Sequence, residues 1–190
     1  MNEQLLIQQL QQGIEQAFAQ VVDAYKHLVY NTVLSLLQNK DEAEDVSQEV
    51  FIQMYQSIGQ FKGESKLSTW LYRIAVSKSL DWQRRKNRKK RFAFIEGLFG
   101  ADDSIKHDPP EFNHPGVVIE NKEKASLLFR AIKSLPENQK VAFTLNKVEG
   151  LSYMEVAEVM QVTEASVEAL LHRAKQNLRK ELGNYYHKHK

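Results

Sequence analysis

Apolar residues recur along this chain at intervals of three and four positions, which is the period of an α-helix buried along one face. The longest such pattern predicts one amphipathic helix over residues 14–37. Its apolar stripe consists of Phe18, Val21, Val22, Tyr25, Leu28 and Val29. No segment shows the strict alternation that is typical of a half-buried β-strand. An all-α fold is therefore expected.

A second helix is predicted directly after this one. Asp41 is expected to cap it, with Glu44 reaching back as in a capping box, and Gly59 is expected to end it. The buried stripe of this helix is Val46, Val50, Met54 and Ile58. Its other side is acidic, with Glu42, Glu44, Asp45 and Glu49. Such a face is either simply solvated or a docking surface for a basic protein partner.

A third helix is predicted over residues 69–90, capped by Ser68 after a polar loop at residues 61–66. Its apolar side carries Leu71, Ile74, Ala75 and Leu80. Seven of the eight residues from 84 to 91 are basic, so this end either lies along DNA phosphates or is a solvated helix end. Trp82 is expected to be the exposed aromatic residue beside that run, whereas Trp70 is expected near the core.

The composition changes between residues 92 and 116. This stretch holds three of the four prolines and three of the eight glycines, together with several acidic residues. It predicts a flexible linker with a helical start, which divides the chain into two small domains, residues 1–91 and 117–190. The linker is long enough for the domains to close on each other.

The second domain is expected to begin with two helices. Apolar residues at helical spacing mark the first of them: Leu127, Leu128, Ala131 and Ile132. Pro136 suits the first position of the next helix, which is expected to run to Val148 and stop at Gly150.

A pair of helices with a tight turn is predicted at the C-terminal end. Ser152 and Glu155 form a capping box for the first helix, and Thr163 caps the second after a turn at residues 161–163. The first helix is expected to turn Tyr153, Val156, Ala157 and Met160 inward. The second is expected to bury Val167, Leu171, Ala174, Leu178 and Leu182. This arrangement is either a plain helical hairpin or a DNA-binding helix-turn-helix, whose second helix enters the major groove.

The composition excludes several kinds of protein. Apolar residues make up 42% of the chain, enough for a core, while the net charge of +2 is too small to identify a nucleic-acid binder. The chain has no cysteine, so disulfides and thiolate metal sites are excluded. We see neither a signal peptide nor an apolar run long enough to span a bilayer. A cytoplasmic protein without direct membrane insertion is expected.

Four segments in order resemble the extracytoplasmic-function (ECF) group of the sigma-70 family of bacterial RNA polymerase sigma factors. They are DEAEDVSQEVF at 41–51, FKGESKLSTWLYRIA at 61–75, Leu135-Pro136, and EGLSYMEVA at 149–157 followed by His172-Arg-Ala174. Each is weak alone, but the four together are specific.

The resemblance implies a role for each surface. The acidic helix is similar to the family's docking surface for core RNA polymerase, with Asp45, Gln48 and Glu49 at matching positions. The loop and the basic helix resemble the part that recognises and opens the −10 promoter element, where a flipped base enters a pocket on the loop. The candidate residues there are Lys62, Gly63, Glu64, Ser65, Lys66, Arg73, Ser77, Lys78, Arg84, Arg85 and Arg88. The helix-turn-helix resembles the reader of the −35 element. Its candidate residues are Thr163, Ser166, Glu168, Ala169, His172, Arg173 and Lys175.

Two departures from the family pattern concern promoter choice. Ser77 stands where the family usually has Asn, so a shorter side chain faces the −10 strand. Glu168, Ala169 and Leu170 stand where the family often has a basic, a small hydroxyl and another basic residue. Since a carboxylate can accept a hydrogen bond from cytosine N4, we expect an unusual −35 sequence.

The implied partners are core RNA polymerase, promoter DNA and an anti-sigma protein. No cofactor is expected, and the protein is not expected to be an enzyme, because the sequence has no phosphate-binding glycine loop and no helical metal-ligand pair. His107 and His114 are interpreted as part of a polar linker rather than as metal ligands. Another helix-turn-helix transcriptional regulator is the alternative, although it would leave the acidic helix unexplained.

Overall fold

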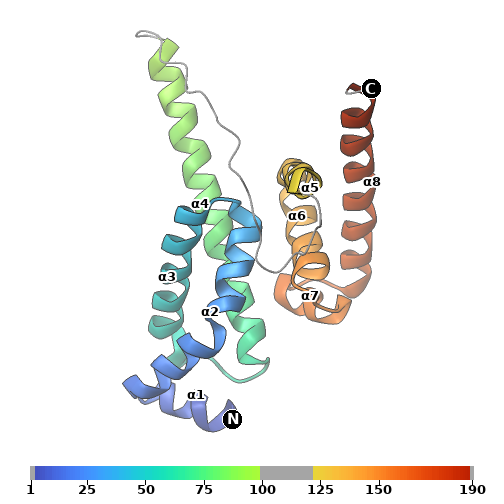
Figure 1. Ribbon diagram of the computed structural model, residues 1–190. Coiled ribbons are helices and arrows are strands. Elements are labelled where there is room, and N and C mark those ends of the chain that lie inside the picture. The colour runs from blue at the N-terminus through green and yellow to red at the C-terminus, as the bar shows by residue number, and fades with distance from the viewer. Residues whose placement is uncertain (1–2, 99–121, 189–190) are drawn as a thin grey trace.

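A computed structural model describes residues 3–98 and 122–188, and every regular element in these ranges is helical (Figure 1). This confirms the all-α prediction. Four helices precede the gap: α1 (Glu3–Gln11), α2 (Glu15–Leu37), α3 (Lys40–Ser57) and α4 (Leu67–Leu98), with a 3₁₀ turn η1 (Ile58–Gln60) after α3. After the gap come α5 (Lys122–Ser134), α6 (Glu137–Phe143), the π-helical turn η2 (Thr144–Val148), α7 (Tyr153–Met160) and α8 (Glu164–Lys188).

Helices α2, α3 and α4 pack together through apolar residues. The predicted stripe of α3 is buried, whereas those of α2 and α4 are buried only in part. Val21 and Val29 of α2, Val50 of α3, and Leu71 and Ala75 of α4 are all fully buried. Helix α1 was not among the predicted elements. It packs against this group through Leu6 and Leu10, which lie four positions apart on one face and are both 2% exposed.

The predicted starts of α3 and α4 are wrong. Asn39, not Asp41, caps α3, since its side chain accepts a hydrogen bond from the backbone N–H of Glu42 at 2.9 Å. Ser68 does not cap α4, because it already lies inside the helix. The backbone N–H of Leu67, at the start of α4, donates instead to the carboxylate of Glu3 at 2.7 Å.

The observed ends of α3 and α4 also differ from the predicted ones. Helix α3 ends at Ser57, and Gly59 lies in the 3₁₀ turn that follows. Helix α4 continues to Leu98, so the predicted helical start of the linker is the end of this long helix. The remainder of the predicted linker, from residue 99, lies outside the described residues, as do the residues up to 121.

The C-terminal helices follow the prediction closely. Ser152 and Glu155 form the complete capping box of α7, and the hydroxyl of Thr163 accepts a hydrogen bond from the N–H of Ser166 at 3.2 Å. The predicted stripe of α8 is confirmed, with Val167, Leu171, Ala174 and Leu178 buried and Leu182 partly buried. In α7 the prediction is wrong for Tyr153, which is 37% exposed because α7 instead buries Val159. Phe129, at 2% exposed, is a core residue of α5 that the sequence pattern missed.

The two halves of the chain are packed against each other. Leu36 of α2 is 1% exposed and joins the apolar cluster of α6, α7 and α8, which Tyr72, Val76 and Leu80 of α4 also contact. Phe129 and Ile132 of α5 belong in turn to the cluster built on α2, α3 and α4. In Figure 1, α7 lies toward the lower half of α4, while the upper end of α4 extends past α2 and α3.

None of the described helices combines the length and the apolar character needed to cross a membrane.

Candidate nucleic-acid interface

The loop at residues 61–66 is anchored at its start and exposed beyond it. Phe61 is 9% exposed, and its ring packs on that of Trp70 with the centroids 4.9 Å apart. Gly63 has a φ of +73°, a left-handed conformation that residues with a Cβ rarely adopt. Lys62, Glu64 and Lys66 then face solvent. The start of the loop is therefore held by packing in the core, while its polar side chains are exposed to solvent.

A cavity of about 850 Å³ lies beside this loop. Its walls come from three segments that are far apart in the sequence: α1, the loop with the start of α4, and the first turns of α7. The side chains that line it are mainly polar, with Phe61 and Met154 among the apolar ones. The resemblance expects a base of the −10 element to bind on this loop, and that expectation stays a prediction.

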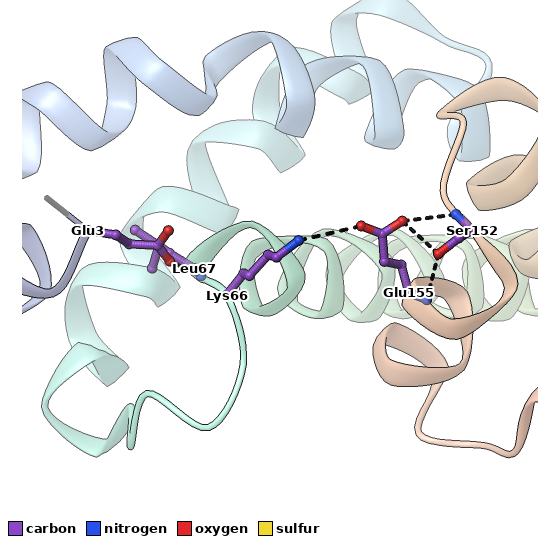
Figure 2. A network of polar contacts seen from close by, with 5 residues as sticks. All are labelled: Glu3, Lys66, Leu67, Ser152 and Glu155. Carbon is purple, nitrogen blue, oxygen red and sulfur yellow. Dashed lines mark hydrogen bonds and ion pairs between the residues drawn. The ribbon is translucent and has the colours of Figure 1, made fainter. Parts of the chain in front are cut away.

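Lys66 connects the loop to the C-terminal domain (Figure 2). Its ammonium lies 3.8 Å from the carboxylate of Glu155. The same carboxylate accepts hydrogen bonds from the backbone N–H and the hydroxyl of Ser152, each at 2.9 Å. These bonds from Ser152, more than Lys66, hold the pKa of Glu155 below its usual value. The capping box of α7 thus also supplies an anion to the predicted −10 loop.

Arg73 and Ser77 lie further along α4 at the boundary between the domains. Two nitrogens of the Arg73 guanidinium donate to the backbone carbonyl of Glu158 at 3.0 and 2.8 Å. Ser77 is exposed and lines, with Arg73, a groove of about 350 Å³ that Asn138 and Gln161 border from the other domain. Both predicted −10 residues therefore face the C-terminal domain in this conformation.

The basic run on α4 is partly paired with carboxylates. Arg84 bonds Glu137 of α6 at 2.5 Å, and Arg85 lies 3.5 Å from Glu49 of α3. A hollow of about 680 Å³ runs along this face of α4, lined by Lys78, Asp81, Arg84, Arg85, Asn87, Arg88 and Arg91. The paired and the open positions together form a basic surface along this face of α4.

The predicted exposure of Trp82 is wrong. Its ring is partly buried against the main core, and its indole Nε1 is buried with no hydrogen-bond partner in the described structure. The guanidinium of Arg85 lies over the ring at 5.5 Å from its centroid. The aromatic surface of Trp82 is therefore covered rather than offered to an unpaired base.

The acidic face predicted for α3 is exposed only in part, because Glu42 is partly buried and pairs with Lys86 of α4. Asp45 and Gln48 are exposed, whereas Glu49 is partly buried beside Arg85. One predicted polymerase-binding residue is thus paired with one predicted DNA-binding residue.

The predicted −35 residues lie along the exposed side of the start of α8. Thr163, Ser166, Glu168, His172, Arg173 and Lys175 are all exposed. Ala169 is partly buried, because it lies beside the face that packs on α7. The predicted −35 surface is therefore exposed to solvent, whereas several residues of the predicted −10 surface contact the C-terminal domain.

Several polar residues at the domain boundary were not predicted. Glu149 accepts a hydrogen bond from Ser35 of α2 at 3.2 Å, and burial raises its pKa to about 7. Lys140 is 6% exposed and donates to Gln83 of α4 at 2.8 Å, and burial lowers its pKa. Glu3 and Gln11 of α1 were also missed. These residues have no pattern in the sequence, because their partners are distant segments.

In the described residues, no group of three or more His, Asp or Glu side chains is placed to hold a metal ion. His107 and His114 lie outside those residues.

Two family models match this chain. The model of sigma-70 region 2 matches residues 21–89, and the model of sigma-70 region 4 matches residues 126–178. The first covers most of α2, all of α3, the loop and most of α4, and the second runs from within α5 to within α8.

Curated relatives match along almost the whole chain. The RNA polymerase sigma-H factor of Pseudomonas aeruginosa is 33% identical over 191 residues, covering 95% of this chain and 94% of that protein. The ECF RNA polymerase sigma-E factor of Escherichia coli is 31% identical over 176 residues, covering 93% and 92%.

Solved structures share the fold. A structure of CnrH in complex with the cytosolic domain of CnrY has a TM-score of 0.66 at 18% identity, covering 96% of this chain and 97% of that one. The sigma factor RpoE in complex with the anti-sigma factor NepR, from Bartonella quintana, has a TM-score of 0.62 at 19% identity, covering 87% and 96%.

Proposed function

The chain belongs to the ECF group of the sigma-70 family and is an alternative RNA polymerase sigma factor, and from this membership we propose how its parts divide the work of initiation. Residues 1–91 bind core polymerase and recognise and melt the −10 element. Residues 117–190 recognise the −35 element through the helix-turn-helix. Residues 92–116 connect the two.

The observation that carries this division is the segregation of charge on the N-terminal helices. Helix α3 exposes the carboxylate of Asp45 and the amide of Gln48, while α4 exposes Arg88 and Lys89. A basic helix attracts DNA phosphates and an acidic helix repels them. The acidic side therefore suits a basic protein surface, which we assign to core polymerase.

The roles of the individual side chains follow from this assignment. Asp45, Gln48 and Glu49 contact polymerase. Lys66, Arg73, Ser77 and the basic run of α4 contact the −10 strand. The space between the loop and α1, which loses its α7 wall when the domains separate, receives an unstacked base. On α8, Glu168 and Arg173 lie where a recognition helix meets base edges.

Promoter recognition requires the two domains to separate. In the closed conformation Lys66, Arg73 and Arg84 each contact a group of the C-terminal domain. These side chains cannot bind phosphates while they hold those contacts. Binding to polymerase would supply the free energy for this separation if polymerase binds the open conformation more tightly than the closed one.

Run-off transcription with core polymerase and a random promoter library tests this function. We expect transcripts only when both proteins are present, and selected templates with two conserved elements. Tight binding of the purified protein to promoter duplex without polymerase, together with no transcription, would favour another helix-turn-helix regulator. If the selection returned the commonest ECF −35 motif, the expectation of an unusual −35 sequence from Glu168 would be wrong.

We propose further that the protein acts by binding, without catalysing a reaction of its own, and works in the cytoplasm, where polymerase and DNA meet. We also propose an anti-sigma partner. The relative RpoE from Bartonella quintana was solved with the anti-sigma factor NepR, which supports this expectation. Co-purification from the native cell would identify such a partner.

A further inference from the structure

Helix α1 contacts both ends of the loop at residues 61–66. At the C-terminal end of the loop, the Glu3 carboxylate accepts a hydrogen bond from the N–H of Leu67 at 2.7 Å (Figure 2). The first N–H groups of a helix have no partner within the helix, and the positive end of the helix dipole favours an anion there. Glu3 therefore caps α4 from a distance of 64 residues along the chain.

At the N-terminal end of the loop, the side chain of Gln11 makes two hydrogen bonds to the backbone. Its side-chain Nε2 donates to the carbonyl of Phe61 at 2.9 Å and to that of Ile58 at 3.3 Å. These are the backbone groups at which the chain leaves the 3₁₀ turn and enters the loop. The two contacts of α1 thus fix the backbone on either side of the exposed loop residues.

Helix α1 is itself held in place. Leu6 and Leu10 are buried in the core shared with α2, α3 and α4. The opposite side of α1 lines the cavity beside the loop with Gln4, Ile7 and Gln8. Helix α1 therefore contributes a wall of the cavity as well as the two contacts to the loop.

We propose that α1 is a brace that sets the position of the loop, and that Glu3 and Gln11 are positioning residues for capture of an unstacked −10 base. The inference rests on the proposed function, because it needs the loop to bind DNA. The match to sigma-70 region 2 begins at residue 21, so α1 lies before the matched segment. A base must be unstacked before it can be trapped, and a loop that is already ordered loses less entropy on trapping it.

The test compares paired variants in the holoenzyme on a promoter taken from the transcription selection, with 2-aminopurine in the non-template strand of the −10 element. Glu3→Ala removes the acceptor, whereas Glu3→Gln keeps an acceptor oxygen at the same position. Gln11→Ala removes the donor. Glu15→Ala and Gln12→Ala are the matched controls, since both residues are exposed and lie next to α1.

We expect the rate of promoter opening to fall about tenfold for Glu3→Ala. A change of this size corresponds to the loss of one hydrogen bond to a charged group. Gln11→Ala should slow promoter opening severalfold. Glu3→Gln should fall between the wild type and Glu3→Ala, because a carboxamide oxygen still accepts from the N–H of Leu67 but carries no charge. The controls, and the affinity of every variant for core polymerase, should be unchanged.

Equal opening rates for the wild type, Glu3→Ala and Gln11→Ala would overturn the brace. The brace would also be overturned if Glu3→Ala and Gln11→Ala lost binding to a duplex that carries only the −35 element by the same factor as they lost promoter opening. General destabilisation of the protein would then explain the defect. If the wild-type holoenzyme opened no library template at all, the proposed function would fail and the brace with it.

Discussion

The guanidinium of Arg73 on α4 caps the C-terminal end of α7 by donating two hydrogen bonds to the backbone carbonyl of Glu158. Carbonyls in the last turn of a helix lack partners within the helix and carry partial negative charge, which a cation stabilises. One side chain of the proposed −10 surface thus serves as an interdomain contact, so domain closure and −10 binding compete for it.

Replacing Arg73 should loosen the closed conformation. Arg73→Ala removes both bonds to Glu158, which we expect to weaken closure by about 1 kcal/mol, since the contact is exposed to solvent. Because the chain has no cysteine, dyes can be attached at cysteines introduced at Gln56 and Gln176. Energy transfer between these dyes should fall in Arg73→Ala.

Lys78→Ala is the control for that measurement, because it also removes a cation from α4. Energy transfer in Lys78→Ala should match that of the wild type. Equal transfer in Arg73→Ala and Lys78→Ala would show that the bond to Glu158 does not hold the domains together.

Glu149 should make domain closure depend on pH. Burial against α2 raises its pKa from an ordinary value of 4.5 to about 7. The neutral acid is therefore the form that suits the closed state. Closure should be strongest below pH 4.5, weaken as pH rises from 4.5 to 7, and become level above 7. Tyr72 of α4 faces the same site, and burial and then Glu149 raise the pKa of its phenol, so it stays neutral throughout.

Glu149→Gln tests this pH dependence. The amide cannot ionise but still has an oxygen to accept the bond from Ser35. The variant should be more stable than the wild type by about 2 kcal/mol at pH 8 and equal to it near pH 4.5. Thermal melting of both proteins from pH 4.5 to 8.5 gives the difference. A difference that does not change with pH would contradict the role of Glu149.

Gly63→Ala should disturb the loop without a steric clash. A Cβ at Gly63 meets nothing within 4 Å, but the φ of +73° is strained for alanine, at a cost of about 1 kcal/mol. The loop should shift to relieve the strain, and promoter opening in the holoenzyme should slow severalfold.

Gly59→Ala is the matched control for this loop substitution. Gly59 also has open space around its Cα, but its φ lies outside the left-handed region. Promoter opening should therefore be unchanged in Gly59→Ala. If both variants behaved alike, the left-handed conformation at residue 63 would not be what positions the loop.

Asp45→Lys should weaken assembly with core polymerase. The substitution reverses a charge on the exposed acidic face of α3, and like charges across an interface cost several kcal/mol when close. We expect a loss of affinity of at least about tenfold, which becomes smaller at high salt. The affinity is measured by titrating labelled protein with core polymerase.

Glu15→Lys makes the same charge change at an exposed position at the start of α2 and should leave that affinity unchanged. Equal losses in Asp45→Lys and Glu15→Lys would mean that net charge, not the face of α3, governs assembly.

Patterns of near neighbours in the sequence predicted much of the fold. The capping box of Ser152 and Glu155 and the cap at Thr163 join residues three positions apart, so they form wherever the helix forms. The stripe of α8 follows the helical period for the same reason, and the candidate −35 residues other than Ala169 are exposed. The misplaced cap of α3 shows the limit of such patterns, because Asn39 and Asp41 are both suitable caps within two residues.

The candidate −10 site was only half predicted. The loop and the basic helix are continuous in the sequence and could be recognised there. The cavity beside the loop could not, since α1 and α7 provide two of its walls. Trp82 was misjudged because its cover comes from the core and from Arg85 rather than from a repeating pattern.

The sequence by itself determined every helix except α1, many of the buried positions, and the acidic and basic character of α3 and α4, because these depend on residues within about four positions of each other. The tertiary structure alone decided that Glu3 caps α4 and that Arg73 caps α7. These partners are 64 and 85 residues apart, and only the packing of helices on one another brings them within hydrogen-bonding distance.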